Sequence, residues 1–339
     1  MFQRNHDVVT IGGATRDIMF YSDAGVVVSN PSDLLRQKLL GFEYGAKVTP
    51  LSLCFTMGGG ACNTAVSFAR LGLKVASFIR LGLDRDGDAI QSELTDEKVN
   101  TKFIERDTKD RTGISFIIIH QPGNEHIAFL HRGANNNMKM TLTELSRART
   151  KWFYVSSLTG TYWRETLRNL AKYLAKNSKK KLAWNPGETQ LKKGRRGLSF
   201  LLKQTEVLIL NKDEATELVY SDKGKMPGIN NPWTLLKTLI SWGPKVVVIT
   251  NGDRGAYAYD GKTLFREPAI KKKAVNTTGA GDAFGSTFIA GLKMFKGDIT
   301  KSLRIASVNS SAVITTTGPQ EGLMSIKHMK ASMKNYIKG

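Results

Sequence analysis

Long apolar runs and cysteines are scarce in this sequence of 339 residues. No uninterrupted apolar run approaches the ~20 residues of a membrane-spanning helix, and residues 1–7 lack the apolar centre of a secretory signal. The two cysteines, Cys54 and Cys62, flank a glycine run and match neither a disulfide framework nor a zinc-site spacing. We therefore expect a cytoplasmic protein without a membrane partner, in which both cysteines are buried thiols.

Acidic residues are also few compared with basic ones. The chain has 29 Asp and Glu against 50 Lys and Arg, a formal net charge of +21 that attracts polyanions. The basic residues cluster at 179–181, 192–196 and 271–273 without interleaved aromatics. No helix-turn-helix, zinc-finger or RNA-stacking motif accompanies them. We therefore expect no specific nucleic-acid partner and interpret the clusters as solvated surface, which serves an anionic substrate equally well.

Strand-like segments alternate with helical patterns along most of the chain, in an ordinary globular composition of 41% hydrophobic and 23% charged residues. Most of the strand-like segments are nearly continuously apolar, which is typical of a parallel sheet buried on both faces. They cover 7–13, 74–82, 151–157, 181–185, 205–211 and 245–252, and helices are predicted at 62–71, 86–98, 161–177, 213–219, 233–241, 281–295 and 298–316. We expect an α/β fold with a mainly parallel central sheet flanked by helices on both faces.

Two stretches interrupt the alternation, at about 18–56 and 101–133. The second contains two strand-like runs, 113–120 and 125–131, that indicate a hairpin. We expect both stretches to meet as a small β-sheet inserted in a single domain of residues 1–339. A sheet attached to one edge of an α/β core is a candidate lid.

The hairpin raises two questions about side-chain direction. Phe116, Ile118 and Phe129 would share one face, where they could bury the lid, join two copies in a homodimer or stack on a nucleoside base. We favour core or dimer packing over base stacking. His126 and His131 are an odd number of residues apart, so they face opposite sides and are not expected to bind a metal.

The segment NTTGAGDAF, residues 276–284, places glycines and an aspartate before a helical pattern. Residues 279–282 should therefore form the first turn of a helix, whose unpaired N–H groups and partial positive charge attract anions. The glycines let an anion approach the backbone. Asp282 beside such an anion suits proton removal from a hydroxyl during phosphoryl transfer. The alternative is that Asp282 only stabilises the start of a helix.

Two common phosphate-binding motifs are absent. The stretch GAYAYDGKT, residues 255–263, has five residues between its glycines where a P-loop needs four. The stretch GAGDAF has Phe284 where a dinucleotide-binding fingerprint needs Gly or Ala.

The motifs that remain resemble the ribokinase-like (PfkB) family of sugar and nucleoside kinases. One signature is the run GGGACNTA at 58–65 with Gly72 and Gly82, and the other is the box NTTGAGD at 276–282. They occur in the family's order about 215 residues apart, and with accessory matches the resemblance covers nearly the whole chain. It implies a ribokinase-like fold, ATP and Mg²⁺ as cofactors, and a sugar or nucleoside as substrate.

Acceptor-binding residues are expected in two places. The run GGGACNTA is a second glycine-rich helix entry, where the amides of Gly59 and Gly60 and the side chain of Asn63 can contact sugar hydroxyls. Tight packing at this turn is the alternative. Asp17, at the end of the first strand-like run, could accept hydrogen bonds from two neighbouring hydroxyls. Alone it would be interpreted as a turn residue, and the family resemblance assigns it to the acceptor.

The resemblance also implies where phosphates, nucleotide and metal bind. Backbone N–H groups of Gly279, Ala280 and Gly281 would form an anion hole. Glu214 would act on Mg²⁺ indirectly, although NKDE at 211–214 is also a capping-box pattern. The residues that would contact the nucleotide or its phosphates are Asn185, Asn211, Thr250, Gly252, Gly255 and Asn309.

One residue departs from the family pattern. Asn276 stands where the family box usually begins with aspartate. The substitution removes a carboxylate that in many members helps to hold a monovalent cation, so we expect only a weak response to potassium.

We therefore expect ATP-dependent phosphorylation of a hydroxymethyl group of a sugar or sugar-like molecule, with Asp282 as general base. The alternatives are a nucleoside kinase of the same fold, a non-catalytic binding protein and a basic RNA-associated protein. Lid residues would select the acceptor, which the sequence does not name.

Overall fold

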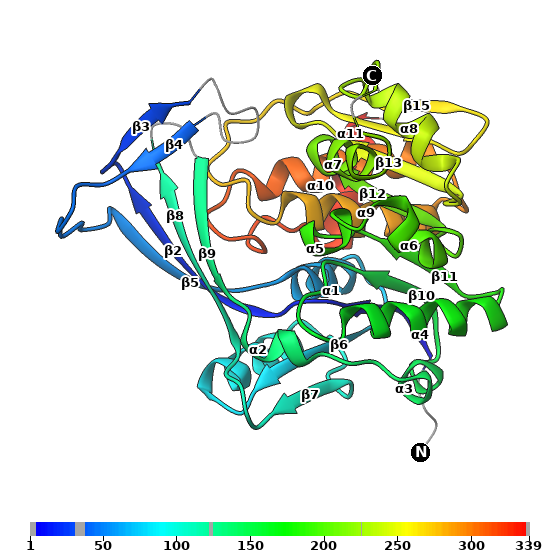
Figure 1. The fold of residues 1–339 in the computed structure, drawn as a ribbon, viewed down its shortest axis with the longest axis horizontal. Coiled ribbons are helices and arrows are strands. Elements are labelled where there is room, and N and C mark those ends of the chain that lie inside the picture. Colours follow the sequence, from blue (N-terminus) through cyan, green and yellow to red (C-terminus); the bar gives the residue numbers. More distant parts are fainter. Residues whose placement is uncertain (1–4, 31–37, 122–124, 225, 337–339) are drawn as a thin grey trace.

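The computed structural model describes residues 5–30, 38–121, 125–224 and 226–336. Within these ranges the core is a nine-stranded sheet of order β15-β14-β13-β12-β11-β10-β1-β6-β7 (Figure 1). The strands β13, β12, β11, β10, β1, β6 and β7 are all parallel to one another. β14 pairs antiparallel with β13, and β15 pairs antiparallel with β14. The bounds are β1 His6–Ile11, β6 Val75–Gly82, β7 Ile104–Asp107, β10 Thr150–Val155, β11 Lys181–Trp184, β12 Val207–Asn211, β13 Val246–Thr250, β14 Ala256–Tyr259 and β15 Leu264–Glu267.

Helices cover both faces of this sheet because its strands are apolar on both sides. One buried cluster joins the sheet to α1 Gly60–Arg70, α2 Arg85–Asp96, α9 Ala280–Met294, α10 Ile299–Val313 and α11 Ile326–Tyr336. The other joins it to α3 Leu142–Arg147, α4 Trp163–Lys176, α5 Glu188–Leu191, α6 Gly194–Leu202, α7 Lys212–Lys223 and α8 Pro232–Ile240. The predicted α/β architecture is confirmed. In the described parts of the chain, no helix is both long and apolar enough to cross a bilayer.

A smaller four-stranded sheet, the lid, lies beside the core at the left of Figure 1. It has the order β5-β2-β8-β9, with β2 Thr15–Ser22, β5 Ser52–Gly58, β8 Gly113–His120 and β9 Glu125–His131. β2 and β8 pair in parallel, so the two stretches that interrupt the alternation do meet. Two further strands, β3 Val26–Ser29 and β4 Lys38–Gly41, form a separate antiparallel pair.

Several elements differ from the sequence-based prediction. β7 falls in the range 101–133 predicted for the lid, but it pairs with β6 in the main sheet. Residues 256–267 form β14 and β15, where no strand was predicted, because four-residue strands such as AYAY give too short a pattern. Helices α3, α5, α6 and α11 were also missed. Of the two thiols, Cys62 is buried as expected, whereas Cys54 on the lid is partly exposed.

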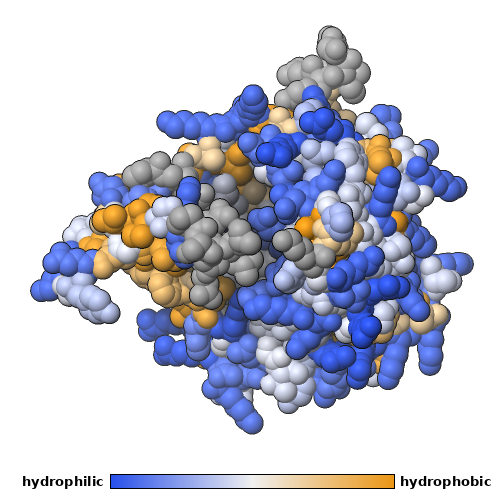
Figure 2. Space-filling view, turned by 45° about the horizontal axis from the view of Figure 1, so that its top comes forward, coloured by the Kyte–Doolittle hydropathy of each residue, from blue (hydrophilic) through white to orange (hydrophobic). Residues whose placement is uncertain are grey.

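The outer face of the lid is apolar and exposed. Figure 2 shows hydrophobic residues gathered at the left of the molecule, where the lid lies, on an otherwise largely hydrophilic face. Large apolar residues with about half or more of their surface exposed include Leu53, Phe55 and Phe129 on the lid sheet, and Val26 and Val27 on β3. This face agrees with the predicted homodimer through the lid, which stays a prediction.

Candidate active site

Two hollows adjoin at the first turn of α9. The lid cavity, of about 250 Å³, lies between the lid and the core and is lined by Asp17, Asn63, Gly279 and Asp282 among others. The α9 groove, of about 170 Å³, is lined by residues of β13, β14, α9 and α10, among them Gly281. The first turn of α9 therefore forms part of the wall of both hollows.

The start of α9 has the geometry that the sequence predicts. Gly279 precedes the helix with φ +79°, and a Cβ there would lie 2.6 Å from a Pro319 carbon, so only glycine fits. A Cβ on Gly281 would meet nothing within 4 Å. The N–H of Ala280 donates to the carbonyl of Thr277 at 3.2 Å, so one of the three predicted anion-hole donors has an internal partner.

Asp282 faces the lid cavity from this turn. Its Oδ2 accepts a hydrogen bond from Asn63 Nδ2 at 2.9 Å, which joins α9 to α1. Burial raises the pKa of Asp282 to about 6; the Asn63 hydrogen bond opposes this shift, and the charge of Asp17 adds to it. Asn63 is itself held by Gln320, whose Nε2 donates to its Oδ1 at 2.9 Å. Gln320 lies outside both signatures, and no sequence pattern indicates its role.

Asp17 lies in β2, the second strand, and not at the end of the first strand as predicted. β1 ends at Ile11 before a Gly-Gly turn, and the chain then enters the lid. The Asp17 side chain is buried, and its Oδ1 accepts a hydrogen bond from Thr15 Oγ1 at 2.7 Å. Burial raises the pKa of Asp17, and hydrogen bonds from Thr15 and Ser115 oppose the shift. A Cβ at Gly58 would lie 1.8 Å from Asp17 Oδ2, so this glycine makes room for the carboxylate.

The other two glycines of the GGG run, Gly59 and Gly60, pack closely against neighbouring residues and also line the lid cavity. Gly59 has φ +90°, and a Cβ there would lie 2.4 Å from the carbonyl oxygen of Gly13. A Cβ at Gly60 would lie 2.7 Å from Ser156 and 3.4 Å from Asp282 Oδ1. Both glycines also line the lid cavity. The packing interpretation is therefore correct, and it leaves these residues at the cavity wall.

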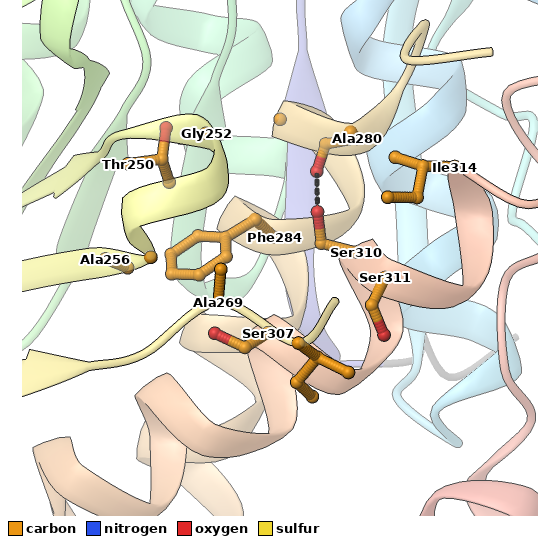
Figure 3. A pocket seen from close by; sticks show the side chains of 13 residues that line it. Thr250, Gly252, Ala256, Ala269, Ala280, Phe284, Ser307, Ser310, Ser311 and Ile314 are labelled. Atoms are coloured by element: carbon orange, nitrogen blue, oxygen red, sulfur yellow. Dashed lines mark hydrogen bonds between the residues drawn. The ribbon is translucent and has the colours of Figure 1, made fainter. Parts of the chain in front are cut away.

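The α9 groove gathers part of the predicted nucleotide site. Thr250 at the end of β13 and Gly252 in the segment after it line the groove opposite Phe284 of α9 (Figure 3). Gly255 belongs to the same lining. Residues of α10 that the sequence did not indicate complete the wall. They are Ser307, Ser310 and Ser311, together with Ile314 directly after the helix. Ser310 Oγ donates to the carbonyl of Ala280 at 3.0 Å.

Asn309 does not line the groove, contrary to the prediction. It is fully buried, its Nδ2 donates to Thr287 Oγ1 at 2.7 Å, and its Oδ1 accepts from the N–H of Met324 at 2.8 Å. The hydrogen bond to Thr287 joins α10 to α9. Because successive residues of a helix point about 100° apart, Asn309 points away from the groove that its neighbours line. Asn185 follows β11, and its Nδ2 donates to the carbonyl of Ile209 at 3.0 Å. It also lies outside the lining of the groove.

Asn211 and Glu214 form a capping box at the start of α7. The N–H of Asn211 donates to Glu214 Oε2, and the N–H of Glu214 donates to Asn211 Oδ1, both at 2.8 Å. Burial raises the pKa of Glu214 to about 7, although the hydrogen bond from Asn211 opposes this, and the charge of Asp282 raises it further. In the described residues no group of three His, Cys, Asp or Glu is placed to hold a metal ion. The described residues therefore contain no group of side chains that would bind Mg²⁺ directly.

Asn276 is buried and fully engaged. Its Nδ2 donates to the carbonyl of Thr317 at 2.7 Å, and its Oδ1 accepts from the N–H of Thr278 at 2.9 Å. The hydroxyl of Tyr21 donates to the same Thr317 carbonyl at 2.7 Å. At the position where the family box usually has aspartate, the structure thus has an amide that donates to an already occupied carbonyl.

The face of the lid that lines the cavity is opposite to the face that was proposed for base stacking. Pairing of Phe116 with Phe129 confirms that these side chains share a face, but the cavity is lined by Ser115, Ile117 and Leu130. Strand residues alternate, so Phe116 and Phe129 point outward. The ring centroids of Phe116 and Phe20 lie 4.3 Å apart, so these two side chains pack against each other. Stacking of a base on Phe116, Ile118 or Phe129 is therefore excluded in this arrangement.

The sequence reasoning missed several side chains that line the lid cavity. They are Ser115, His126, Arg132, Asn135, Ser157 and Thr159. From the sequence, His126 is interpreted only as a possible metal ligand. Arg132 and Asn135 belong to the stretch RGANNN after β9, which matches none of the sequence motifs described above.

Comparison with known proteins agrees with this geometry. Residues 33–326 match the family model described as pfkB family carbohydrate kinase. The chain is 30% identical over 283 residues to a ribokinase of Lactococcus lactis, with 82% of this chain and 85% of that protein covered. It is 28% identical over 297 residues to a 5-dehydro-2-deoxygluconokinase of Listeria innocua, with 82% and 87% covered.

The fold agrees as well. The structure of Arabidopsis thaliana ribokinase complexed with ribose and ATP superposes with a TM-score of 0.77 at 18% identity, covering 98% of this chain and 99% of that one. The match of the family model and the identity to the Lactococcus protein both span most of the chain. This protein therefore belongs to the pfkB family of carbohydrate kinases and is a phosphotransferase with a ribokinase-like fold.

Proposed function

We propose that this enzyme transfers the γ-phosphoryl group of ATP to a hydroxymethyl group of a sugar or sugar-like small molecule. The observation that carries the proposal is the first turn of α9, which forms part of the wall of both hollows. Asp282 faces the lid cavity, whereas Ala280 and Gly281 face the α9 groove. A carboxylate on the acceptor side and amides on the phosphate side are what an in-line transfer requires.

Asp282 acts as general base in this proposal. Asn63 holds Oδ2, which leaves Oδ1 for the attacking hydroxyl. With a pKa of about 6 the carboxylate is ionised at neutral pH and remains a better base than an exposed aspartate. As the hydroxyl oxygen forms a bond to the γ-phosphorus, its proton passes to Asp282. The bond from phosphorus to the bridging oxygen breaks, and ADP leaves.

Gly279, Ala280 and Gly281 form the proposed anion hole. N–H groups at a helix start favour negative charge, so they would stabilise the oxygens of the transferring group. The hydrogen bond of 3.2 Å between the Ala280 N–H and the Thr277 carbonyl is long, and a charged phosphoryl oxygen would displace it.

Nucleotide and metal belong on the groove side. Mg²⁺ bound together with ATP would supply positive charge that offsets the charge of the phosphates. Glu214 suits an indirect role, because Oε2 takes the capping hydrogen bond and Oε1 remains for a metal-bound water. Thr250, Gly252 and Gly255 would contact the nucleotide. Asn185 and Asn211 lie outside the lining of this groove and carry no role in the proposal.

The acceptor is held by Asp17, Gly59, Gly60 and Asn63, all on the wall of the lid cavity. The lid would close over it and exclude water as a competing nucleophile. The test is a panel of sugars and nucleosides incubated with MgATP, with ADP and the mass of the product measured. Turnover of a nucleoside far above every sugar would establish the nucleoside alternative, and absence of turnover with binding retained would establish the non-catalytic one.

Changing Gly281 to alanine should separate activity from stability. A methyl group at Gly281 meets no atom within 4 Å, and alanine favours a helix over glycine by about 0.5–1 kcal/mol, so the protein should not lose stability. The methyl would project into the α9 groove and hold the phosphate away from the amides. We expect kcat/KM for ATP to fall about 10- to 100-fold.

The matched variant Gly279→Ala should instead lose stability, because of its positive φ and the contact with Pro319. Steady-state kinetics and thermal denaturation of both variants check the pair. Normal kinetics of Gly281→Ala would remove the anion hole from the proposal.

Changing Asn276 to aspartate should create a potassium response. The wild-type rate should differ little between potassium, sodium and a bulky organic cation, because the amide of Asn276 donates where a cation needs oxygens. Aspartate would place a carboxylate beside the Thr317 carbonyl, and a bound cation would compensate its buried charge. Turnover of both proteins in the three chloride salts at equal ionic strength measures the effect. Strong potassium-specific activation of the wild type would contradict this prediction.

A further inference from the structure

A third hollow, the basal cavity, lies at the opposite end of the main sheet from the lid cavity. It has a volume of about 470 Å³ and is lined by residues 5–7 and 149–151 together with Lys74 and Lys180. β1 and β10 begin at this cavity, whereas Gly12 and Ser157, which follow the other ends of these strands, line the lid cavity. The length of both strands therefore separates the basal cavity from the proposed active site.

Positive charge dominates the wall of the basal cavity. Among its described lining residues the cationic ones are Lys74, Arg149, Lys151 and Lys180, and the acidic one is Asp7. Asp7 is already compensated, because its Oδ1 pairs with Lys293 Nζ at 2.5 Å and its Oδ2 accepts from the N–H of Lys74 at 2.9 Å. The Lys74 ammonium group also acts on the charge of Asp7. This carboxylate therefore has no charge left to offset the other cations.

The three remaining cations have no acidic partner in the described chain. Lys180 Nζ donates to the carbonyl of Thr150 at 2.6 Å, which is a neutral acceptor. The side chains of Arg149 and Lys151 take part in no hydrogen bond or ion pair with any residue that the structure describes. Like charges around one hollow repel each other, and a hollow lined by one sign of charge concentrates the electrostatic potential. A multivalent anion in the cavity would offset this repulsion.

The backbone at Arg149 gives a second, independent reason to examine this site. Arg149 directly follows Ala148, the C-cap of α3, and has φ +37°. Glycine is the usual residue at such a position because it adopts positive φ without strain. A cation after a helix end interacts favourably with the helix dipole, which accounts for part of the preference at this one position. It does not account for the lysines that reach the same hollow from β10 and from the segments before β6 and β11.

We propose that the basal cavity binds a small multivalent phosphate, such as pyrophosphate or a phosphate monoester. A guanidinium group binds phosphate oxygens through parallel hydrogen bonds, and lysines add compact positive charges around it. The volume lies in the range of small-molecule pockets, ~300–1,000 Å³, which favours a soluble anion over RNA or a membrane surface. This site is separate from the proposed phosphoryl transfer and does not depend on it.

Pyrophosphate is the probe in the first experiment. Calorimetric titration at constant ionic strength measures its binding to the whole protein, and displacement of a fluorescent ATP analogue measures the part that enters the α9 groove. We expect calorimetry to detect a saturable site whose affinity differs from that obtained by displacement. Acetate at the same ionic strength should not compete for this site, because one negative charge compensates the cations poorly.

Two variants locate the site. Arg149→Gly should weaken the calorimetric affinity for pyrophosphate by about 10-fold or more, since it removes hydrogen bonds between charged groups. The same change removes the strain of a positive φ, so Tm should be unchanged or higher. Lys151→Gln, at an exposed position of β10, should also weaken binding. Displacement of the ATP analogue should be unaffected in both variants.

Arg147→Gln is the matched control. Arg147 is exposed in the last turn of α3, and it does not line the basal cavity. Removing this charge should change the affinity for pyrophosphate by less than about 3-fold, because exposed charges outside the cavity are screened by salt.

Three results would overturn the proposal. Equal weakening by Arg147→Gln and Arg149→Gly would show that the surface attracts anions only diffusely. Parallel changes in calorimetry and displacement would place the pyrophosphate in the α9 groove. RNA or anionic vesicles that bind through Arg149 while pyrophosphate does not would identify a macromolecular or membrane partner instead. If Arg149→Gly lowered Tm, the response of Lys151→Gln would decide between a binding role and a structural one.

Discussion

Replacing Asp282 by asparagine should lower kcat by about 10²–10⁴-fold and at the same time stabilise the folded protein at neutral pH. The loss follows from removal of the general base, since an amide cannot take the proton. Asn63 can still donate to the new Oδ1, so the helix pair and the binding of ATP should be preserved. Steady-state kinetics, with nucleotide binding as a check, measures the loss.

The gain in stability follows from the raised pKa of Asp282. Folding raises this pKa from 3.8 to about 6, so the folded protein binds the proton more tightly than the unfolded chain does. Stability associated with the proton is present below about pH 4 and is lost as the pH rises through 6. At pH 7 an uncharged side chain avoids that loss, which is about 1–3 kcal/mol. The difference in unfolding free energy between variant and wild type should therefore vanish near pH 4. The kcat/KM of the wild type should also fall as the pH drops below about 6.

A matched control separates this role from that of an ordinary acid at a helix start. Asp86 occupies the first turn of α2, outside the lining of both hollows. Asp86→Asn should leave kcat unchanged and destabilise the protein by about 0.3–1 kcal/mol, because the helix start favours a negative charge. If Asp282→Asn destabilised the protein in the same way and retained near-normal turnover, Asp282 would be only a first-turn acid.

Asp17→Ala should cut kcat/KM for the sugar acceptor by at least about 10-fold, because hydrogen bonds to a charged group are worth about 1.5–3 kcal/mol. Asp17 is the carboxylate that the lid itself contributes to the cavity, and its Oδ1 already accepts from Thr15. Its raised pKa shows that burial is incompletely compensated in the free protein. Hydroxyls of a bound sugar would supply the remaining hydrogen bonds.

The KM for ATP should change little in this variant, because Asp17 does not line the α9 groove. Asp23→Ala is the matched control, since Asp23 follows the same strand and is exposed. Kinetics with acceptor and ATP varied separately measures the effect. Equal changes in both variants, or an effect confined to ATP, would show that Asp17 does not hold the acceptor.

Local pattern in the sequence determined the alternation of strands and helices, the glycines with positive φ and the aspartate in the first turn of α9. These features depend on residues close together in the chain, such as 276–284 or the GGG run, so their physical causes can be evaluated without the rest of the fold. The family resemblance added the expected acceptor and nucleotide residues. The four acceptor residues all line the lid cavity, whereas Asn185, Asn211 and Asn309 lie outside the lining of the α9 groove.

Tertiary structure alone decided which of several equivalent directions each side chain takes. Alternation in β8 predicts that Phe116 and Ile117 face opposite sides, but only packing of the lid against the core shows that Ile117 faces the cavity. In α10 the same uncertainty concerned Asn309, which is turned toward α9 while its neighbours reach the groove. A periodic pattern fixes the spacing of residues on a face and leaves open which face meets the ligand.

Long-range neighbours were likewise beyond the sequence. Gln320 holds Asn63 across 257 positions of the chain, and Asn63 holds Asp282 across 219. Arg132 belongs to no motif, and only the fold places it on the wall of the lid cavity. Which side chains line a cavity depends on all the elements that the fold brings together, so this property exists only in the folded chain.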